Sequence, residues 1–256
     1  MGREVRLFYP PRRIVSLVPS QTELLLDLGL RRQLVGVTKF CIHPPTARHE
    51  ASVIGGTKNF DFAKISAVHP DLIIGNKEEN YPEGIAQLGQ DYPVWMSNIT
   101  DLPEALDMIR RVGAITGTAH RAEPLAATIA TSFAELRLTG APIPAAYFIW
   151  RKPYMAAAGG TFIHDILGRA GFRNVFAHLG RYPEITPAQL AAAAPARIFL
   201  SSEPYPFAEK HLAEFQEICP VASIQLVDGE LFSWYGSRLR WSASYFQQLR
   251  ATAGPG

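Results

Sequence analysis

The sequence is poor in cysteine and in concentrated charge. Its 256 residues include only two cysteines, Cys41 and Cys219, which lie in different halves and have no nearby partner for a CxxC metal or redox motif. We interpret them as reduced, buried thiols. The formal net charge is +2, and basic residues come in pairs at most, such as Arg12-Arg13. A nucleic-acid partner is therefore not expected, because it needs a concentrated basic face.

Long hydrophobic runs are missing as well. No run reaches the roughly 18–20 apolar residues that a membrane helix needs. At the start of the chain, Gly2-Arg3-Glu4 leads into a strand-like segment without the apolar region of an export signal. We expect either a cytoplasmic protein or one whose export signal is not part of this sequence. Hydrophobic residues nevertheless make up 47% of the chain, which excludes a disordered protein.

Motifs of catalysis are also absent. The sequence contains no GxSxG elbow, no HExxH, no phosphate-binding P-loop and no GxGxxG. Its seven histidines are scattered, and no two of them have the i, i+4 spacing of helical metal ligands. We therefore predict no catalytic residue and expect the protein not to be an enzyme.

The first half alternates short apolar strands with helices. Residues 13–18 are rich in β-branched side chains, which is typical of a buried parallel strand. Ser20-Gln21-Thr22-Glu23 has the spacing of a capping box and predicts a helix that ends at Gly29. The same patterns predict strands at 35–37, 71–75 and 93–96, and helices at 62–68 and 82–88.

The second half repeats this plan. Strands are predicted at 146–150 and 197–201 and from Pro220-Val221 onward, and helices at 161–167, 187–194 and 207–218. Pro70 and Pro195 are 125 residues apart, and so are Glu78 and Glu203. The fold class that follows is α/β, with two pseudo-symmetric Rossmann-like lobes, mainly parallel sheets and a long α-helix joining them.

The predicted organisation has three parts. Residues 1–98 form an N-terminal α/β lobe, 99–143 form a connecting helical segment, and 144–256 form a C-terminal α/β lobe. The long helix of the connector covers about 118–138, which corresponds to roughly 30 Å. Because ligands bind at the carboxyl ends of parallel strands, we expect the strand-end loops of both lobes to surround one ligand.

Loop aromatics and basic side chains are the predicted ligand-binding residues. Rings at strand ends can line a large apolar pocket, and long basic side chains can orient the ligand. The predicted set is Phe40, Lys58, Phe60, Trp150, Arg151, Tyr154, Tyr205, Trp234, Tyr235 and Arg238.

Two smaller groups of polar residues are also singled out. Glu78, Glu79 and Glu203 occupy matching loops of the two halves, where they would meet arginines of a two-fold symmetric partner. Cys41 and His43 share one side of an extended segment and are candidate metal ligands, but they supply only two of the ligands that such a site needs.

Together these residues resemble the helical-backbone metal receptors, the class III periplasmic binding proteins of ABC importers. The resemblance is carried by the RIVSLVPSQTE opening at 13–23, by Pro70-Asp71-Leu72-Ile73-Ile74, by residues 162–171 and by the Pro220-Val221 strand. It implies two lobes joined by a rigid helix, a ligand between them and little hinge motion. The implied function is that of a solute-binding protein, without an intrinsic cofactor, for a metal chelate such as cobalamin or another corrinoid, a ferric siderophore or haem.

The resemblance also implies partners and a place. The partners are the chelate itself and a dimeric permease, to which the three glutamates would dock. The chain would be a monomer in the periplasm or at the cell surface. Thr57 stands where cobalamin receptors carry an aromatic residue, and Ala63 stands at the docking glutamate of the first lobe. Two alternatives remain open, a receptor of this fold that binds zinc or manganese directly and a cytoplasmic enzyme on a two-lobed α/β scaffold.

Overall fold

A computed structural model describes residues 4–251, which form two compact units. Unit 1 contains the chain up to Asn98 together with Pro103–Ile129 and Gly236–Arg238. Unit 2 contains Ile99–Leu102, Ala130–Tyr235 and the chain from Leu239 onward. The predicted connector at 99–143 is therefore divided between the two units. Gly2 and Arg3 lie outside the described residues, and the segment at 4–12 that we expected to be strand-like contains no strand.

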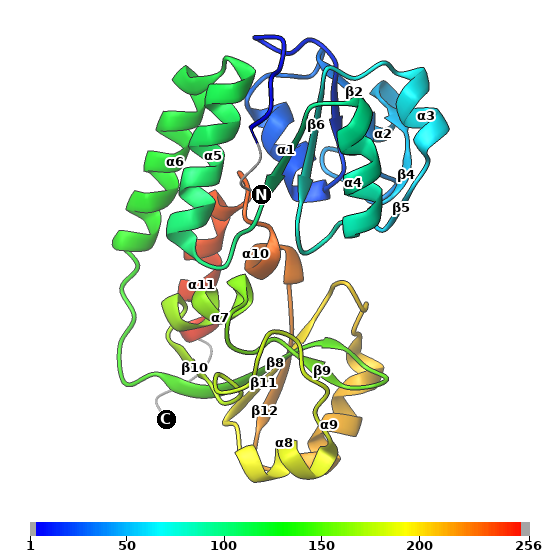
Figure 1. Cartoon of the computed structure of the whole chain (residues 1–256). Coiled ribbons are helices and arrows are strands. Elements are labelled where there is room, and N and C mark those ends of the chain that lie inside the picture. The colour runs from blue at the N-terminus through cyan, green and yellow to red at the C-terminus, as the bar shows by residue number, and fades with distance from the viewer. Residues whose placement is uncertain (1–3, 252–256) are drawn as a thin grey trace. The chain divides into compact units, whose positions relative to one another are not determined.

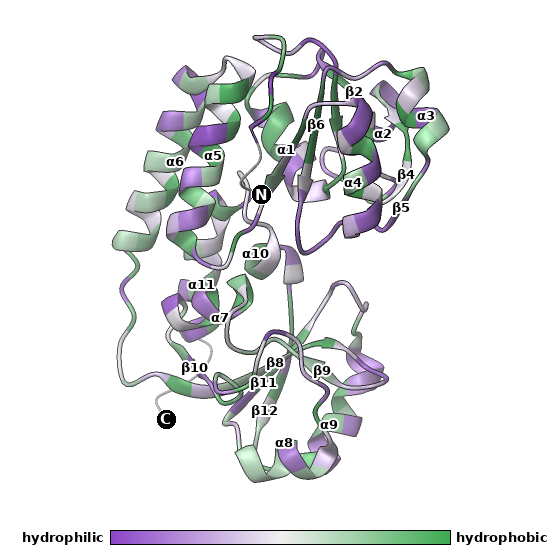
Figure 2. Ribbon diagram, viewed as in Figure 1, coloured by the Kyte–Doolittle hydropathy of each residue, from purple (hydrophilic) through white to green (hydrophobic). Residues whose placement is uncertain are grey.

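Unit 1 is built on a five-stranded parallel sheet of order β3-β2-β1-β6-β7 (Figure 1). Ile14, Val15 and Ile73 on its central strands are fully buried, as parallel strands covered on both faces require. Figure 2 shows β6 in the green of hydrophobic residues. The strands are β1 (Ile14–Ser16), β2 (Leu34–Val37), β3 (Ser52–Val53), β6 (Leu72–Asn76) and β7 (Val94–Ser97).

Four helices and a short hairpin accompany this sheet. The helices are α1 (Pro19–Asp27), α2 (Ala47–Glu50), α3 (Phe62–Ala67) and α4 (Pro82–Asp91). The hairpin joins β4 (Gly55–Gly56) to β5 (Asn59–Phe60) in antiparallel pairing. The helices and strands predicted for this half are thus present, with ends that differ from the prediction by at most three residues, as at the end of α4.

The predicted capping box at the start of α1 is wrong. Helix α1 begins at Pro19, its N-cap is Val18, and no side chain caps it. Proline suits this first position because it has no N–H that would need a partner. Ser20 therefore lies inside the first turn. The end of the helix is as predicted, since Gly29 has a φ of +84° and its N–H donates to the Leu26 carbonyl.

Two antiparallel helices follow, α5 (Leu102–Thr116) and α6 (Ala119–Ala134), which lie side by side in Figure 1. Gly113 permits their close approach, because a Cβ there would lie 2.3 Å from the Ala122 side chain. The helix predicted to reach 138 ends at Ala134. Beyond it, Arg250 donates to the carbonyls of Thr139 and Ala141, at 3.0 and 2.7 Å, and these bonds hold the chain in a non-helical path.

Unit 2 repeats the strand order of unit 1. Its parallel strands run β10-β8-β11-β12, which corresponds to β2-β1-β6-β7, and β9 (Met155–Ala156) adds an antiparallel partner to β8. The strands are β8 (Ile143–Trp150), β10 (Phe172–Asn174), β11 (Arg197–Ser201) and β12 (Ser223–Val227). The last strand was expected from Pro220-Val221, but these residues form a turn in which Val221 is 95% exposed.

The helices of unit 2 are α7 (Phe162–Arg169), α8 (Pro187–Ala193), the 3-10 turn η1 (Glu209–His211), α9 (Leu212–Ile218), α10 (Gly229–Ser233) and α11 (Leu239–Ala251). Aromatic rings fill much of the interior. Phe148 packs on Phe215 with ring centroids 5.0 Å apart, and Phe232 packs on Phe246 at 4.7 Å. The prediction of an α/β fold with parallel sheets is confirmed.

Candidate ligand-binding site

A pair of aromatic rings, the exposed Trp150 and the half-buried Tyr205, marks one edge of the unit 2 sheet. Trp150 ends β8, and Tyr205 lies in the loop after the neighbouring parallel strand β11, so the two loops meet. The ring centroids are 5.6 Å apart with an interplanar angle of 68°, an edge-to-face contact. Trp150 is 40% exposed, and its Nε1–H donates to the Lys152 carbonyl at 3.2 Å. The pair therefore offers a fixed aromatic surface to a ligand.

A charged network supports this pair. Glu214 of α9 accepts from the Arg151 guanidinium, with Nη2 at 2.7 Å, and also from the Tyr154 hydroxyl. Burial and the contact with Glu214 raise the pKa of Tyr154 to about 12, so its phenol stays protonated at neutral pH. Four predicted ligand residues, Trp150, Arg151, Tyr154 and Tyr205, are thus brought together in unit 2.

His211 completes the surroundings of Tyr205. Its Nδ1 accepts from the Ala208 N–H at 2.9 Å, which leaves the proton on Nε2, 3.3 Å from the Tyr205 hydroxyl. Burial, together with the charges of Arg151 and Lys210, lowers the pKa of His211 and favours the neutral ring. Sequence reasoning missed His211 and Glu214, because polar residues of a helix look like solvated surface until the facing loops are known.

Trp234 and Tyr235 differ from the prediction of exposed ligand contacts. Trp234 is 6% exposed, and its Nε1–H donates to Glu203 at 2.9 Å. Tyr235 is buried edge-to-face on Phe162. Glu203 also accepts from the Ser233 hydroxyl at 2.6 Å. Its carboxylate is engaged within unit 2, and its role in docking stays a prediction.

We expect Glu203→Gln to gain stability relative to the parent as the pH rises. Burial raises the pKa of Glu203, since it outweighs the bonds from Ser233 and Trp234. A carboxyl whose pKa is higher in the folded than in the unfolded state loses stability as the pH rises through that interval. Urea unfolding at pH 4 and pH 7 measures the difference, and Glu209→Gln, on an exposed residue, is the control. An equal pH response of all three proteins would contradict this expectation.

In unit 1 the predicted ligand residues separate into exposed and buried ones. Phe40 is exposed with Lys39 over its ring at 5.0 Å, and Lys58 is exposed in the turn between β4 and β5. Phe60 is 4% exposed and stacks on Tyr81 at 4.8 Å in the core of the unit. The prediction for Phe60 is therefore corrected, because its ring stabilises unit 1 instead of facing solvent.

Arg238 forms a buried ion pair inside unit 1. Its Nε and Nη2 donate to Glu23 at 3.0 and 2.7 Å, in a two-bond pair whose side chains are about nine-tenths buried. This corrects the prediction of Arg238 as a ligand contact. The RIVSLVPSQTE motif thus contributes the partner of a buried arginine, a role that its spacing alone does not reveal.

Glu78 and Glu79 lie in the loop after β6. Their backbone N–H groups donate to the Asn76 side-chain oxygen at 2.8 and 3.3 Å, which fixes the loop. Both residues are half-buried. Their role in docking stays a prediction.

Cys41 is a buried thiol in contact with two hydroxyls. Its sulfur lies 3.1 Å from Thr22 Oγ1 and 3.3 Å from Thr38 Oγ1. Burial raises its pKa, which disfavours the thiolate that binds metal. His43 is only half-buried. Within residues 4–251, no group of three or more His, Cys, Asp and Glu side chains is arranged to hold a metal ion.

We expect neither cysteine to react with a thiol reagent at pH 8 while the protein is folded. Burial raises the pKa of both Cys41 and Cys219, so the reactive thiolate is scarce at each. Titration with a chromogenic disulfide should count no thiol in buffer and two in denaturant. Rapid labelling of Cys41 in buffer would show that its pocket opens.

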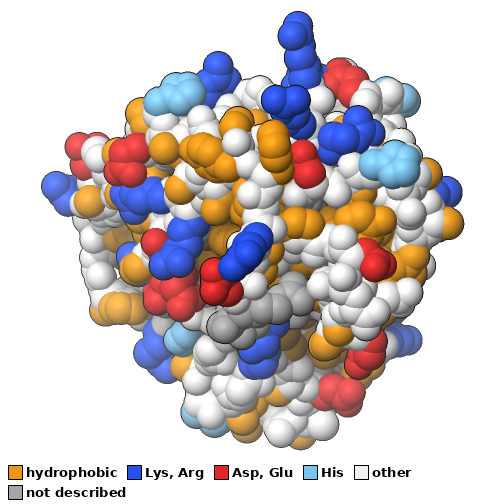
Figure 3. All heavy atoms as spheres, turned by 45° about the horizontal axis from the view of Figure 1, so that its top comes forward, with side chains coloured by type: hydrophobic (Ala, Val, Ile, Leu, Met, Phe, Trp, Pro, Cys, Tyr) orange, Lys and Arg blue, Asp and Glu red, His pale blue; other side chains and the backbone are white. Residues whose placement is uncertain are grey.

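The surface carries mixed charge. On the face displayed in Figure 3, basic and acidic side chains are interspersed with hydrophobic ones. This agrees with the small formal net charge of +2. In the described part of the chain, no helix is both long and apolar enough to cross a membrane.

Comparison with known proteins places these observations in a family. Residues 14–218 match the periplasmic binding protein family. A vitamin B12-binding protein of Vibrio cholerae is 28% identical over 198 residues, which are 75% of this chain and 71% of the relative. A vitamin B12-binding protein of Pectobacterium carotovorum is 24% identical over 253 residues, which are 96% of this chain and 91% of the relative.

Solved structures share the fold. The periplasmic vitamin B12 binding protein of Vibrio cholerae superposes with a TM-score of 0.78 at 23% identity, covering 95% of this chain and 98% of that one. A periplasmic haem-binding protein in complex with two haems gives 0.82 at 20% identity, covering 94% and 98%. The resemblance drawn from the sequence is thereby confirmed, and this chain belongs to the periplasmic binding protein family, whose members are substrate-binding proteins and not enzymes.

Proposed function

We propose that this chain is the solute-binding component of an ABC importer and that it binds a large metal chelate. Corrinoids such as cobalamin, haem and ferric siderophores make up this ligand class. The chain would carry out no reaction of its own. It would act as a monomer outside the cytoplasmic membrane and deliver its ligand to a dimeric permease.

The observation that carries the proposal is the Trp150–Tyr205 pair beside the Arg151–Glu214 ion pair. A flat macrocycle can lie on an exposed indole and bury most of its face there, and each aromatic ring can bury about 150–250 Å². The adjoining Arg151 can orient a carboxylate or amide at the rim of the ligand. The names of the relatives, which bind vitamin B12 or haem, support the same ligand class.

A ligand panel tests the proposal. The purified protein is incubated separately with cyanocobalamin, haemin, a ferric catecholate chelate and ZnCl₂, and analysed by native mass spectrometry and by absorbance. We expect a one-to-one complex with at least one of the three chelates and no stable complex with zinc. Binding of zinc alone would support the direct metal receptor instead. Binding of none of the four would overturn the proposed ligand class.

A further inference from the structure

A hollow in the surface of unit 2 lies between helix α7 and the edge strand β10. Its volume is about 410 Å³, which falls within the range of small-molecule sites. Polar side chains of His164, Asp165, Arg169 and Arg173 line it, together with the apolar Phe172. None of the aromatic residues of the proposed chelate site borders it.

Among the described residues that line the hollow, the positive charges outnumber the negative ones by one. Asp165 accepts from Arg169 Nε at 2.6 Å and from the Leu102 N–H at 2.9 Å, so its carboxylate is occupied within the unit. Arg169 and Arg173 supply two guanidinium groups and Asp165 supplies one carboxylate. Since Asp165 pairs with Arg169, the charge of Arg173 is not neutralised by a lining residue. Arg173 is exposed on β10, next to the buried Phe172 and Asn174.

The hydrogen bonds of Asn174 fix the proton of His164. Asn174 Oδ1 accepts from the Phe176 N–H at 3.0 Å, so its Nδ2 is the atom that faces the Ala157 carbonyl at 2.8 Å. The same Nδ2 lies 3.4 Å from His164 Nδ1. An amide nitrogen only donates, so Nδ1 of His164 is the acceptor and Nε2 carries the hydrogen. The N–H at Nε2 is then the side of the ring left for a ligand.

We propose that this hollow binds a small organic oxyanion, a carboxylate or a phosphate ester with a short apolar body. The oxyanion accepts from the Arg173 guanidinium and from the His164 Nε2–H, and the apolar body lies at the Phe172 side. Gly168 also lines the hollow, and a Cβ at this position would meet nothing within 4 Å, so a larger side chain fits there without a clash. The proposal stands apart from the chelate site and is independent of the proposed function.

Three probes test the site by NMR on ¹⁵N-labelled protein. Phenyl phosphate, benzoate and inorganic phosphate are titrated separately, and the backbone amides of α7 and β10 are followed. We expect saturable shifts there, with phenyl phosphate or benzoate binding at least threefold more tightly than inorganic phosphate. The tighter of these two organic probes identifies the head group. Absence of saturable shifts with all three probes would overturn the proposal.

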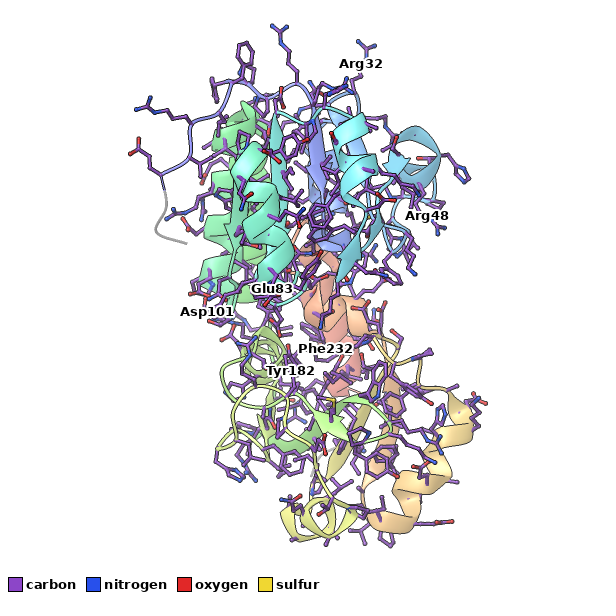
Figure 4. All side chains as sticks on the ribbon, turned by 45° about the vertical axis from the view of Figure 1, so that its right-hand side comes forward. Arg32, Arg48, Glu83, Asp101, Tyr182 and Phe232 are labelled. Atoms are coloured by element: carbon purple, nitrogen blue, oxygen red, sulfur yellow. The ribbon has the colours of Figure 1, made fainter. Side chains whose placement is uncertain are left out.

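Matched variants separate the site from general charge attraction. Arg173→Ala should weaken binding at least tenfold, because a charge-assisted bond is lost. Arg32→Ala removes the same charge from an exposed arginine of unit 1, which extends into solvent in Figure 4, and should change binding less than twofold. Gly168→Leu, which alters no charge, should block the hollow while circular dichroism shows an unchanged fold. If Arg173→Ala and Arg32→Ala lowered the affinity for the probe equally, the binding would be explained by non-specific attraction between the anion and the positive charges of the protein.

Discussion

Trp150→Ala should weaken binding of the chelate about tenfold to a hundredfold. Truncating a central aromatic residue of a binding surface costs about 2 kcal/mol or more, and 1.4 kcal/mol corresponds to a factor of ten in affinity. Trp150 is suited to this role because it is exposed yet held by Tyr205 and by the Lys152 carbonyl. Isothermal calorimetry with the chelate selected by the ligand panel measures the change.

Trp241 provides a matched control for this experiment. It is also an exposed tryptophan of unit 2, at 46%, and lies under the Arg240 guanidinium at 4.5 Å, but it belongs to α11. Trp241→Ala should leave the affinity within about twofold of the parent, a change well under 1 kcal/mol. If Trp241→Ala weakened binding as much as Trp150→Ala does, the ligand surface would have to be sought elsewhere.

Arg238→Ala should lower the free energy of unfolding by about 3–5 kcal/mol. Removing one partner of a buried ion pair leaves the other charge without compensation, and Glu23 is that charge here. Chemical denaturation measures the loss. If Arg238 were instead a ligand contact, the substitution would weaken binding and leave the stability nearly unchanged.

The double variant Glu23→Leu with Arg238→Met completes the test. Replacing both members of a buried pair with apolar residues is often neutral or stabilising, so we expect a stability equal to the parent or higher at pH 7. Burial raises the pKa of Glu23 despite the arginine beside it. The parent should therefore lose stability relative to the double variant as the pH rises from 4 to 7. If the double variant were as unstable as Arg238→Ala, the loss of stability in Arg238→Ala would come from lost packing and not from an unpaired charge.

The strands were predictable because parallel strands buried on both faces need continuous apolar runs, and Leu72-Ile73-Ile74 is such a run. The Trp150–Tyr205 pair was partly predictable for a related reason. Loops that follow neighbouring parallel strands meet at one edge of the sheet, so aromatic residues in both loops come together. Sequence order alone does not supply that neighbourhood, because β9 and β10 lie between β8 and β11 in the sequence and both also pair with β8.

The direction in which each loop side chain points could not be predicted from the sequence. Phe60, Trp234 and Phe40 all lie in or beside loops, yet only Phe40 points to solvent. The direction of a loop ring depends on the space that the packed core leaves, as for Phe60 on Tyr81. The Glu23–Arg238 pair joins residues 215 positions apart, and no local spacing predicts such a partner.

That separation has a consequence for how the protein is made. Unit 1 includes Gly236–Arg238, so a ribosome that has finished the first unit's sheet has not yet supplied the cation that neutralises Glu23. The last strand of that sheet, β7, ends at Ser97, and at about 5–20 residues per second the next 141 residues, up to Arg238 (238 − 97), take roughly 7–28 s to synthesise. Through that interval the first unit lacks the partner of Glu23, so this buried ion pair can form only after Arg238 has been synthesised.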